Sequence, residues 1–383
     1  MKTLHHRCEG LDVHKKEVEA CLRLAIRNDA THEVRRFPTT TRGLIKLADW
    51  LEQAGCTHVA MEATGVYWKP VWHILEGHGF QQILANAAHI KAVPGRKSDT
   101  NDATWISDLL AHGLIRASFV PPQPIQELRD LTRTRKQLTR EIVQHTQRIQ
   151  AVLEEANIKL SSVITDILGM SGRRILRAIV AGDIDPMKLA ELGGPRLAAT
   201  KSELADALHG RVRLHHRFLI EQHLKTIEQL EETITAFDGR IEAALEPFRG
   251  VIERLKEIPG LSEASVQILL AEISTDMTRF PTAGHLLSWA GLIPRLDDSA
   301  GKRRSTRVKN GAPWLKPVLV QCAWAASRKK NSYFEAHYLR LKSTPRLKKS
   351  CCRRRGLDPD HRLPHVGRRH LLPGPRRRSF RSP

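Results

Sequence analysis

The chain has 383 residues, with 62 Lys and Arg against 41 Asp and Glu, and a formal net charge of +21. A hydrophobic content of 41% is sufficient for a buried core and excludes a wholly disordered chain. No apolar run reaches the roughly 18 residues of a membrane span, and the first residues show no secretory signal. We therefore expect a cytoplasmic protein, not a membrane protein, with a polyanionic partner.

The first part of the chain alternates two kinds of segment. Short apolar runs typical of strands lie around 10–13, 18–24, 57–63 and 82–87. Amphipathic segments over 41–54 and 67–79 end at glycine, as helices commonly do. Strands that alternate with helices predict a layered α/β domain, to which we assign residues 1–124.

A long helical pattern follows. Apolar residues recur at alternating spacings of three and four over 125–152 and again over 220–248. This heptad pattern predicts a helical coiled-coil linker over residues 125–250. The two helices could pair within one chain or between subunits, and the pattern leaves both possibilities open.

Residues 251–342 predict a mostly helical C-terminal domain. The segment LKEIPGLSEASVQILLAEI (255–273) resembles a helix-hairpin-helix motif, whose turn can offer backbone N–H groups to a DNA phosphate. An ordinary helix-turn-helix in a small bundle explains the pattern equally well. Trp289, Trp314 and Trp324 could stack on bases, but their apolar neighbours favour core packing.

The last segment, residues 343–383, has a different composition. It contains 13 Lys and Arg against two acidic residues and shows neither helical nor strand periodicity. We expect a disordered basic arm. A shifted reading frame is the alternative, because a one-base shift from Ser350 permits an amphipathic helix followed by a turn.

Four acidic residues lie at the predicted ends of strands or at a helix start: Asp12, Glu62, Asp99 and Asp102. Clustered carboxylates of this kind can hold two divalent ions, as two-metal phosphoryl chemistry requires. Ordinary explanations remain for Asp12 as a turn residue and for Asp99 and Asp102 as helix caps. Glu62 is harder to explain structurally, because a carboxylate that closes an apolar strand needs a partner.

Five blocks lie in order over most of residues 8–342: GLDVHK, MEATGVYW, NAAHIKAVPGRKSDTNDA, IPGLSEASVQILLAEI and FPTAGHLLSWAGLIPRLDDSAGKRRSTRVKNGAPWLKPVLVQCAWAA. Together they resemble the DEDD-type transposases of insertion sequences whose recombination is guided by a bridge RNA. The resemblance implies a RuvC-like, ribonuclease-H-type domain followed by the helical linker and a serine transposase domain.

The resemblance also implies roles for individual residues. Asp12, Glu62, Asp99 and Asp102 would be catalytic and would hold Mg²⁺ or Mn²⁺. The nucleophile would be Ser299, with Ser305 as the nearest competitor, because this chain has Ser-Ala-Gly where the family has Ser-Gly. The basic run beside it suits phosphate positioning, although a solvated loop is the plainer interpretation. Its members are Lys302, Arg303, Arg304, Arg307 and Lys309.

The implied function is a transposase or recombinase that cleaves and exchanges DNA strands through a serine–DNA covalent intermediate. DNA and a guide RNA would be its partners, in a homodimer or tetramer associated with the nucleoid when DNA is bound. Two alternatives remain: a metal nuclease like a Holliday-junction resolvase, which uses water instead of serine, and an inactive nucleic-acid-binding remnant. The remnant is considered because the family continues after the LKS region with an apolar helix that this chain lacks in its own frame.

Overall fold

The computed structural model describes residues 3–26, 29–63, 65–93, 101–294, 297–299, 302–305, 308 and 311–343. The chain divides into two compact units, Met1–Val120 (unit 1) and Pro121–Pro383 (unit 2). The tail predicted to be a basic arm lies outside the described residues. The further division of unit 2 at residue 250 stays a prediction.

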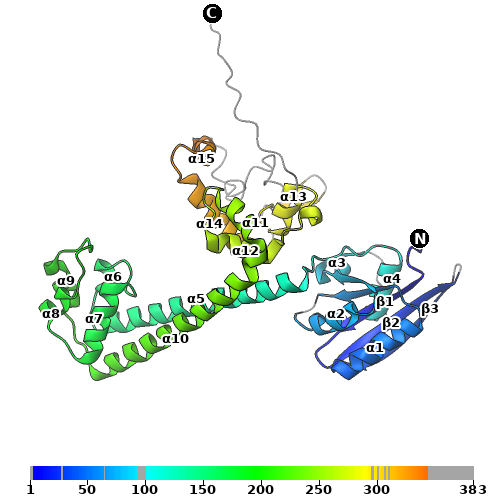
Figure 1. Ribbon diagram of the computed structural model, residues 1–383, viewed down its shortest axis with the longest axis horizontal. Coiled ribbons are helices and arrows are strands. Elements are labelled where there is room, and N and C mark those ends of the chain that lie inside the picture. The colour runs from blue at the N-terminus through cyan, green and yellow to red at the C-terminus, as the bar shows by residue number, and fades with distance from the viewer. Residues whose placement is uncertain are drawn as a thin grey trace, which may run out of the picture. The chain divides into compact units, whose positions relative to one another are not determined.

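Unit 1 is built on a five-stranded sheet in the order β3-β2-β1-β4-β5 (Figure 1). The strands are β1 (Arg7–Val13), β2 (Glu17–Ile26), β3 (Asp29–Pro38), β4 (His58–Glu62) and β5 (Gln81–Ala85). β1, β2 and β3 form an antiparallel meander, whereas β4 and β5 run parallel to β1. The four predicted strands are confirmed. β3 was not predicted, because nearly all its side chains are exposed and it lacks an apolar alternation.

Helices cover both faces of this sheet. α1 (Thr41–Gln53) and α2 (Trp68–Glu76) pack on one face, against Leu11 and Val59. α3 (Ala87–Ala92) and α4 (Asp102–Ala111) pack on the other face, where Cys8 and Ala60 are buried. Successive residues of β1 therefore point alternately to the two layers, which gives the predicted α/β architecture.

Unit 2 contains the two predicted long helices, α5 (Gln123–Glu155) and α10 (Leu214–Leu245). They lie side by side within the chain, so the intrachain pairing that the heptad pattern left open is found (Figure 1). Apolar residues from both helices meet at each end of the pair. Two polar contacts interrupt the seam: an ion pair of Arg135 with Asp238, and His145 with His223, whose Nδ1 atoms are 3.0 Å apart.

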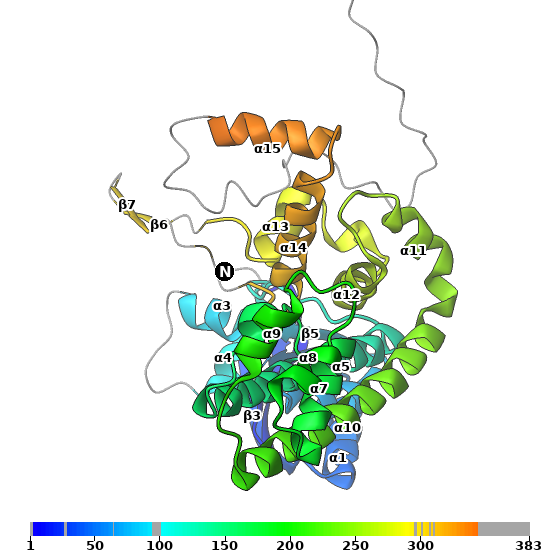
Figure 2. The same cartoon turned by 90° about the vertical axis from the view of Figure 1, so that its left-hand side faces the viewer.

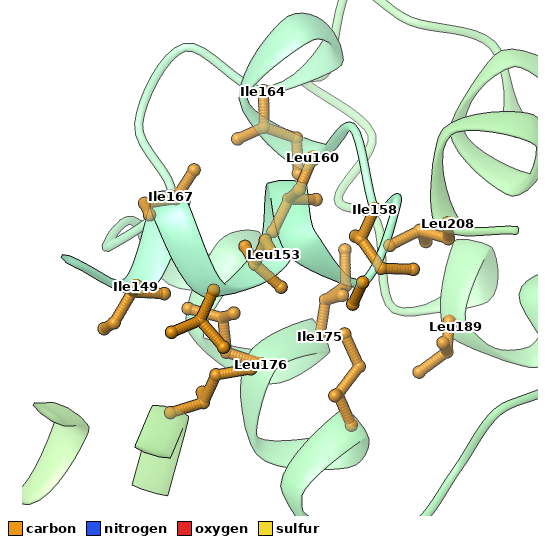
Figure 3. Packing of buried hydrophobic residues seen from close by; sticks show 14 of the residues in the cluster. Ile149, Leu153, Ile158, Leu160, Ile164, Ile167, Ile175, Leu176, Leu189 and Leu208 are labelled. Carbon is orange, nitrogen blue, oxygen red and sulfur yellow. The ribbon is translucent and has the colours of Figure 1, made fainter. Parts of the chain in front are cut away.

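Four shorter helices complete one end of the pair. They are α6 (Leu160–Val163), α7 (Met170–Ala181), α8 (Pro186–Glu191) and α9 (Lys201–Leu208). Figure 3 shows their shared apolar core, in which Ile149 and Leu153 of α5 pack with Leu160, Ile175 and Leu176. Because these side chains are almost fully buried, the hydrophobic effect holds this end of the helix pair together.

The rest of unit 2 is mostly helical. It comprises η1 (Glu246–Phe248), α11 (Arg249–Lys256), α12 (Glu263–Ile273), η2 (Met277–Arg279), α13 (Ala283–Trp289), the hairpin β6 (Asp297–Ser299) and β7 (Lys302–Ser305), α14 (Leu315–Ser327) and α15 (Tyr333–Ser343). α15 packs against α14, as Figure 2 shows. None of the described helices is long and apolar enough to cross a membrane.

The Pro-Gly turn between α11 and α12 packs against α14. Gly260 has φ +88°, and a Cβ at this position would lie 2.4 Å from the Cys322 carbonyl oxygen and 2.6 Å from the Ala326 nitrogen. The glycine is therefore required for close backbone packing inside the bundle. This contact favours the ordinary helix-turn-helix interpretation over a turn that approaches DNA.

Candidate functional site

Two of the predicted acidic residues lie at one edge of the unit 1 sheet. β1 and β4 run parallel with Leu11 opposite Met61, so Asp12 and Glu62 follow as neighbours at the carboxyl ends of adjacent strands. Ends of parallel strands meet at the same edge of a sheet, which is where ligands bind in open α/β sheets. The sequence prediction that these two carboxylates are neighbours is consistent with this register.

Gly10 allows the third carboxylate to approach. A Cβ at Gly10 would lie 2.2 Å from the Ala103 carbonyl oxygen and 2.4 Å from the Ser107 nitrogen, so the α4 backbone rests directly on β1. Asp12 is two residues further along the same face of β1. The start of α4, with Asp102 in its first turn, is thereby held beside that face.

The start of α4 is also fixed by polar contacts. Asn101 is the N-cap, and its side-chain oxygen accepts a hydrogen bond of 2.8 Å from the Ala103 N–H. Its amide nitrogen donates a hydrogen bond to the Glu19 carboxylate, and Glu19 lies opposite Asp12 in the register of β1 and β2. Among the described residues, Asn101 therefore performs the capping that the sequence alternative assigned to Asp102, while Asp102 lies in the first turn of α4, where its charge favours the helix dipole.

The electrostatics of Asp12 link the three carboxylates. Burial raises the pKa of Asp12, and the nearby charges of Asp102 and Glu62 raise it further, while His14 opposes this shift. His14 forms an ion pair of 3.1 Å with Asp12. Like charges from β4 and α4 therefore act on Asp12, an arrangement that a bound cation would stabilise.

Only the chemical type of the donor atoms agrees with the predicted metal site. Carboxylate oxygens are suitable ligands for Mg²⁺ or Mn²⁺. Within the residues that the structure describes, however, no group of three or more His, Cys, Asp or Glu side chains lies close enough together to hold a metal ion. Asp99, the fourth predicted ligand, lies outside the described residues.

The predicted serine and basic run fall in unit 2. Ser299 lies in β6 opposite Lys302 of β7, and Asp298 lies opposite Arg303. The described backbone thus places Ser299 and Lys302 on adjacent strands of one short hairpin, with Arg304 also in β7. Arg307 and Lys309 lie outside the described residues.

The three tryptophans have different environments. Trp289 packs against the apolar cluster around Leu287, as the sequence favoured. Trp324 is 43% exposed, which contradicts core packing for this residue. Trp314 is half-buried and lies near two arginines: Arg133 and Arg140 are 5.6 and 5.1 Å from its ring centroid.

Sequence reasoning missed Glu9, on the opposite face of β1 from Asp12. Glu9 is fully buried, and neither of its carboxylate oxygens has a hydrogen-bond partner among the described residues. Burial, followed by the charge of Glu33, raises the pKa of Glu9 well above its ordinary value. Its position in an apolar strand was the available signal, the same one that drew attention to Glu62.

Two family models match the chain. Residues 9–158 match the DEDD model of IS110 type, described as a transposase, and residues 252–339 match the "Transposase IS116/IS110/IS902 family". Together the two matches span more than half of the 383 residues. The chain belongs to the IS110-type transposases. A search of the curated proteins finds no match to this transposase.

The predicted site residues fall within the two matched ranges. The first matched range contains Asp12, Glu62, Asp99 and Asp102, and the second contains Ser299. A transposase of this family acts on DNA, which agrees with the basic composition of the chain.

Proposed function

We propose that this transposase is a recombinase of an insertion sequence that cleaves and rejoins DNA through a covalent phosphoserine link. Its nucleophile is Ser299, and its acidic site is formed by Asp12, Glu62, Asp99 and Asp102 in a ribonuclease-H-type, RuvC-like unit 1. A guide RNA and a second or further copies of the chain complete the assembly.

The observation that supports this proposal is the placement of Asp12 beside Glu62 at the ends of two parallel strands, with the start of α4 packed against the same strand, and both Glu62 and Asp102 raise the pKa of Asp12. A fold rarely gathers like charges at a sheet edge without a compensating ligand, because their repulsion disfavours the charged forms. Within the described residues, these three carboxylates do not by themselves form a group that holds a metal ion, so binding of Mg²⁺ or Mn²⁺ would also require Asp99. When bound, such an ion supplies a Lewis acid that stabilises negative charge on phosphate oxygens.

The chemical step uses the serine hydroxyl. The Oγ atom of Ser299 attacks a phosphodiester phosphorus, the new Oγ–P bond forms, and the P–O bond to a deoxyribose oxygen breaks. The hydroxyl proton passes to a general base, and the leaving oxygen takes up a proton. The phosphoserine link conserves the energy of the broken bond, so strands can be rejoined without ATP.

The basic run has a positioning role in this scheme. Lys302, Arg303 and Arg304 in β7, with Arg307 and Lys309 nearby in sequence, would bind phosphates on either side of the cleaved bond. Arginine suits this task because its planar fork can form two parallel hydrogen bonds to one phosphate.

A covalent-capture assay tests the proposed function. The full-length protein, Mg²⁺, the RNA that flanks the element and junction DNA are mixed and separated under denaturing conditions. We expect a protein–DNA adduct that is lost in Ser299→Ala and in Glu62→Gln but kept in the matched control Ser305→Ala. Nicked DNA without an adduct would support the resolvase-like nuclease, and bound but intact DNA would support the inactive remnant.

A further inference from the structure

A basic stripe runs along α5, separate from its apolar seam with α10. Arg129, Arg133, Lys136 and Arg140 are spaced by four, three and four residues, which places them on one face of the helix. Arg129 and Arg133 contact α12, and Arg133 and Arg140 approach Trp314 immediately before α14. The stripe therefore faces the α12–α14 side of unit 2.

The first two arginines of the stripe are already engaged by groups of α12. Arg133 donates two hydrogen bonds of 2.8 and 2.9 Å to the Glu272 carboxylate, which is only 1% exposed. Arg129 donates to the carbonyl oxygens of Ala271 and Glu272, at 3.0 and 2.8 Å. These contacts are a structural anchor between α5 and α12, since they satisfy a buried charge with good geometry.

The next two cations have no such acid. Lys136 and Arg140 line a cleft between α5, α12 and the start of α14, together with Trp314 and Gln321. Glu272 is the one acid among the described residues that line this cleft, and Arg133 already holds it. The cleft is partly open to solvent.

The lining of the cleft also includes apolar side chains. Ile268, Pro313 and Val318 line it together with the cations. Trp314, 5.1 Å from the Arg140 guanidinium, orients that side chain through a cation–π contact. Lys136 and the exposed Arg140 and Gln321 therefore bring two positive charges and a hydrogen-bonding amide to this partly open cleft.

We propose that this cleft binds a backbone phosphate of nucleic acid through Lys136 and Arg140, with Trp314 holding Arg140 in place. A phosphate fits because it is compact and anionic and accepts several hydrogen bonds from ammonium, guanidinium and amide donors. The site adds a contact to nucleic acid at a distance along the chain from the basic run at 302–309. It rests on the proposed function only in taking nucleic acid as the ligand.

Fluorescence anisotropy with labelled 30-base-pair duplex DNA and with single-stranded RNA of one strand's sequence tests the inference. Binding is measured from 0.1 to 0.4 M NaCl in EDTA, so no catalytic step contributes. We expect Lys136→Gln/Arg140→Gln to weaken binding of at least one probe about 10- to 100-fold at 0.1 M salt and to lower the salt slope by about 2 for DNA. Trp314→Leu should weaken it by about two- to fivefold.

The matched control removes two positive charges elsewhere in unit 2. Lys188 and Arg196 are exposed in the α7–α9 region, so Lys188→Gln/Arg196→Gln tests the effect of net charge alone. Thermal unfolding of each variant checks that it is folded. The probe that loses affinity identifies DNA or RNA as the ligand. Equal affinities and salt slopes for the cleft variant and the control, with both probes, would overturn the inference, whatever the capture assay shows.

Discussion

Partly and fully buried carboxylates have different neighbouring charges in the two units of this transposase. In unit 2, Glu272 is 1% exposed and is held by two hydrogen bonds from Arg133. In unit 1, the Asp12 side chain is 23% exposed, and its neighbours include two further carboxylates that raise its pKa. Glu272 is paired with arginine, whereas Asp12 has two carboxylates near it in addition to His14.

The difference separates a structural acid from a candidate functional one. A carboxylate that stabilises a fold is surrounded by donors, because an unpaired buried charge costs several kcal/mol. Carboxylates that repel one another at a sheet edge lower stability unless something else binds there. We therefore expect substitutions of the two kinds of acid to have opposite consequences for stability and for ligand binding.

The largest stability effect is expected at Glu272. Glu272→Gln leaves Arg133 without its carboxylate and should lower the free energy of unfolding by about 4 kcal/mol, measured by urea denaturation. Glu263→Gln, at an exposed position of the same helix, should cost less than about 1 kcal/mol. Equal losses in the two variants would show that the Glu272 contacts are not a structural anchor.

Gly10 gives the next largest effect and bears on the acidic site. A Cβ in Gly10→Ala would lie 2.2 Å from the Ala103 carbonyl oxygen, so α4 must move away from β1 at a cost of about 2–3 kcal/mol. Gly77→Ala is the control, since no atom lies within 4 Å of a Cβ there. Urea denaturation measures both, and an unchanged Gly10→Ala protein would contradict the close packing of α4.

Glu9 gives a smaller effect of opposite sign. Because burial raises the pKa of Glu9, the folded state binds a proton more tightly than the unfolded state, and stability falls as pH rises above the unfolded value of about 4.3. Glu9→Gln removes this loss and should stabilise the protein at pH 7 by about 1–2 kcal/mol. Urea denaturation at pH 4 and pH 7 measures it, and a variant as pH-dependent as the wild type would exclude Glu9 as the cause.

Sequence patterns predicted the strands and helices that carry a regular apolar spacing. The strands at 10–13 and 57–63 and the heptad helices carry regular apolar spacings, so their existence was readable. β3 was not, because its exposed side chains leave no periodic signal and the strand depends on pairing with β2. The intrachain pairing of α5 with α10 depends on tertiary contacts that no spacing specifies.

The candidate site shows the same limit. The acidic residue types were visible in the sequence, but the role of Gly10 depends on which helix lies over β1, and that is a property of the folded chain. The cap likewise proved to be Asn101, one residue before the predicted Asp102. The regular spacing of four basic residues on α5 was visible in the sequence: Arg129, Arg133, Lys136 and Arg140. The pairing of Arg133 with Glu272 was not.

Divalent-metal binding tests the central claim, that carboxylates from two strands and a helix form one site. Calorimetric titration of Mn²⁺ should show a site in the wild type that weakens at least about tenfold in each of Asp12→Asn, Glu62→Gln and Asp102→Asn. The control Asp49→Asn, at an exposed position of α1, should bind like the wild type. Wild-type affinity in all three site variants would contradict the account.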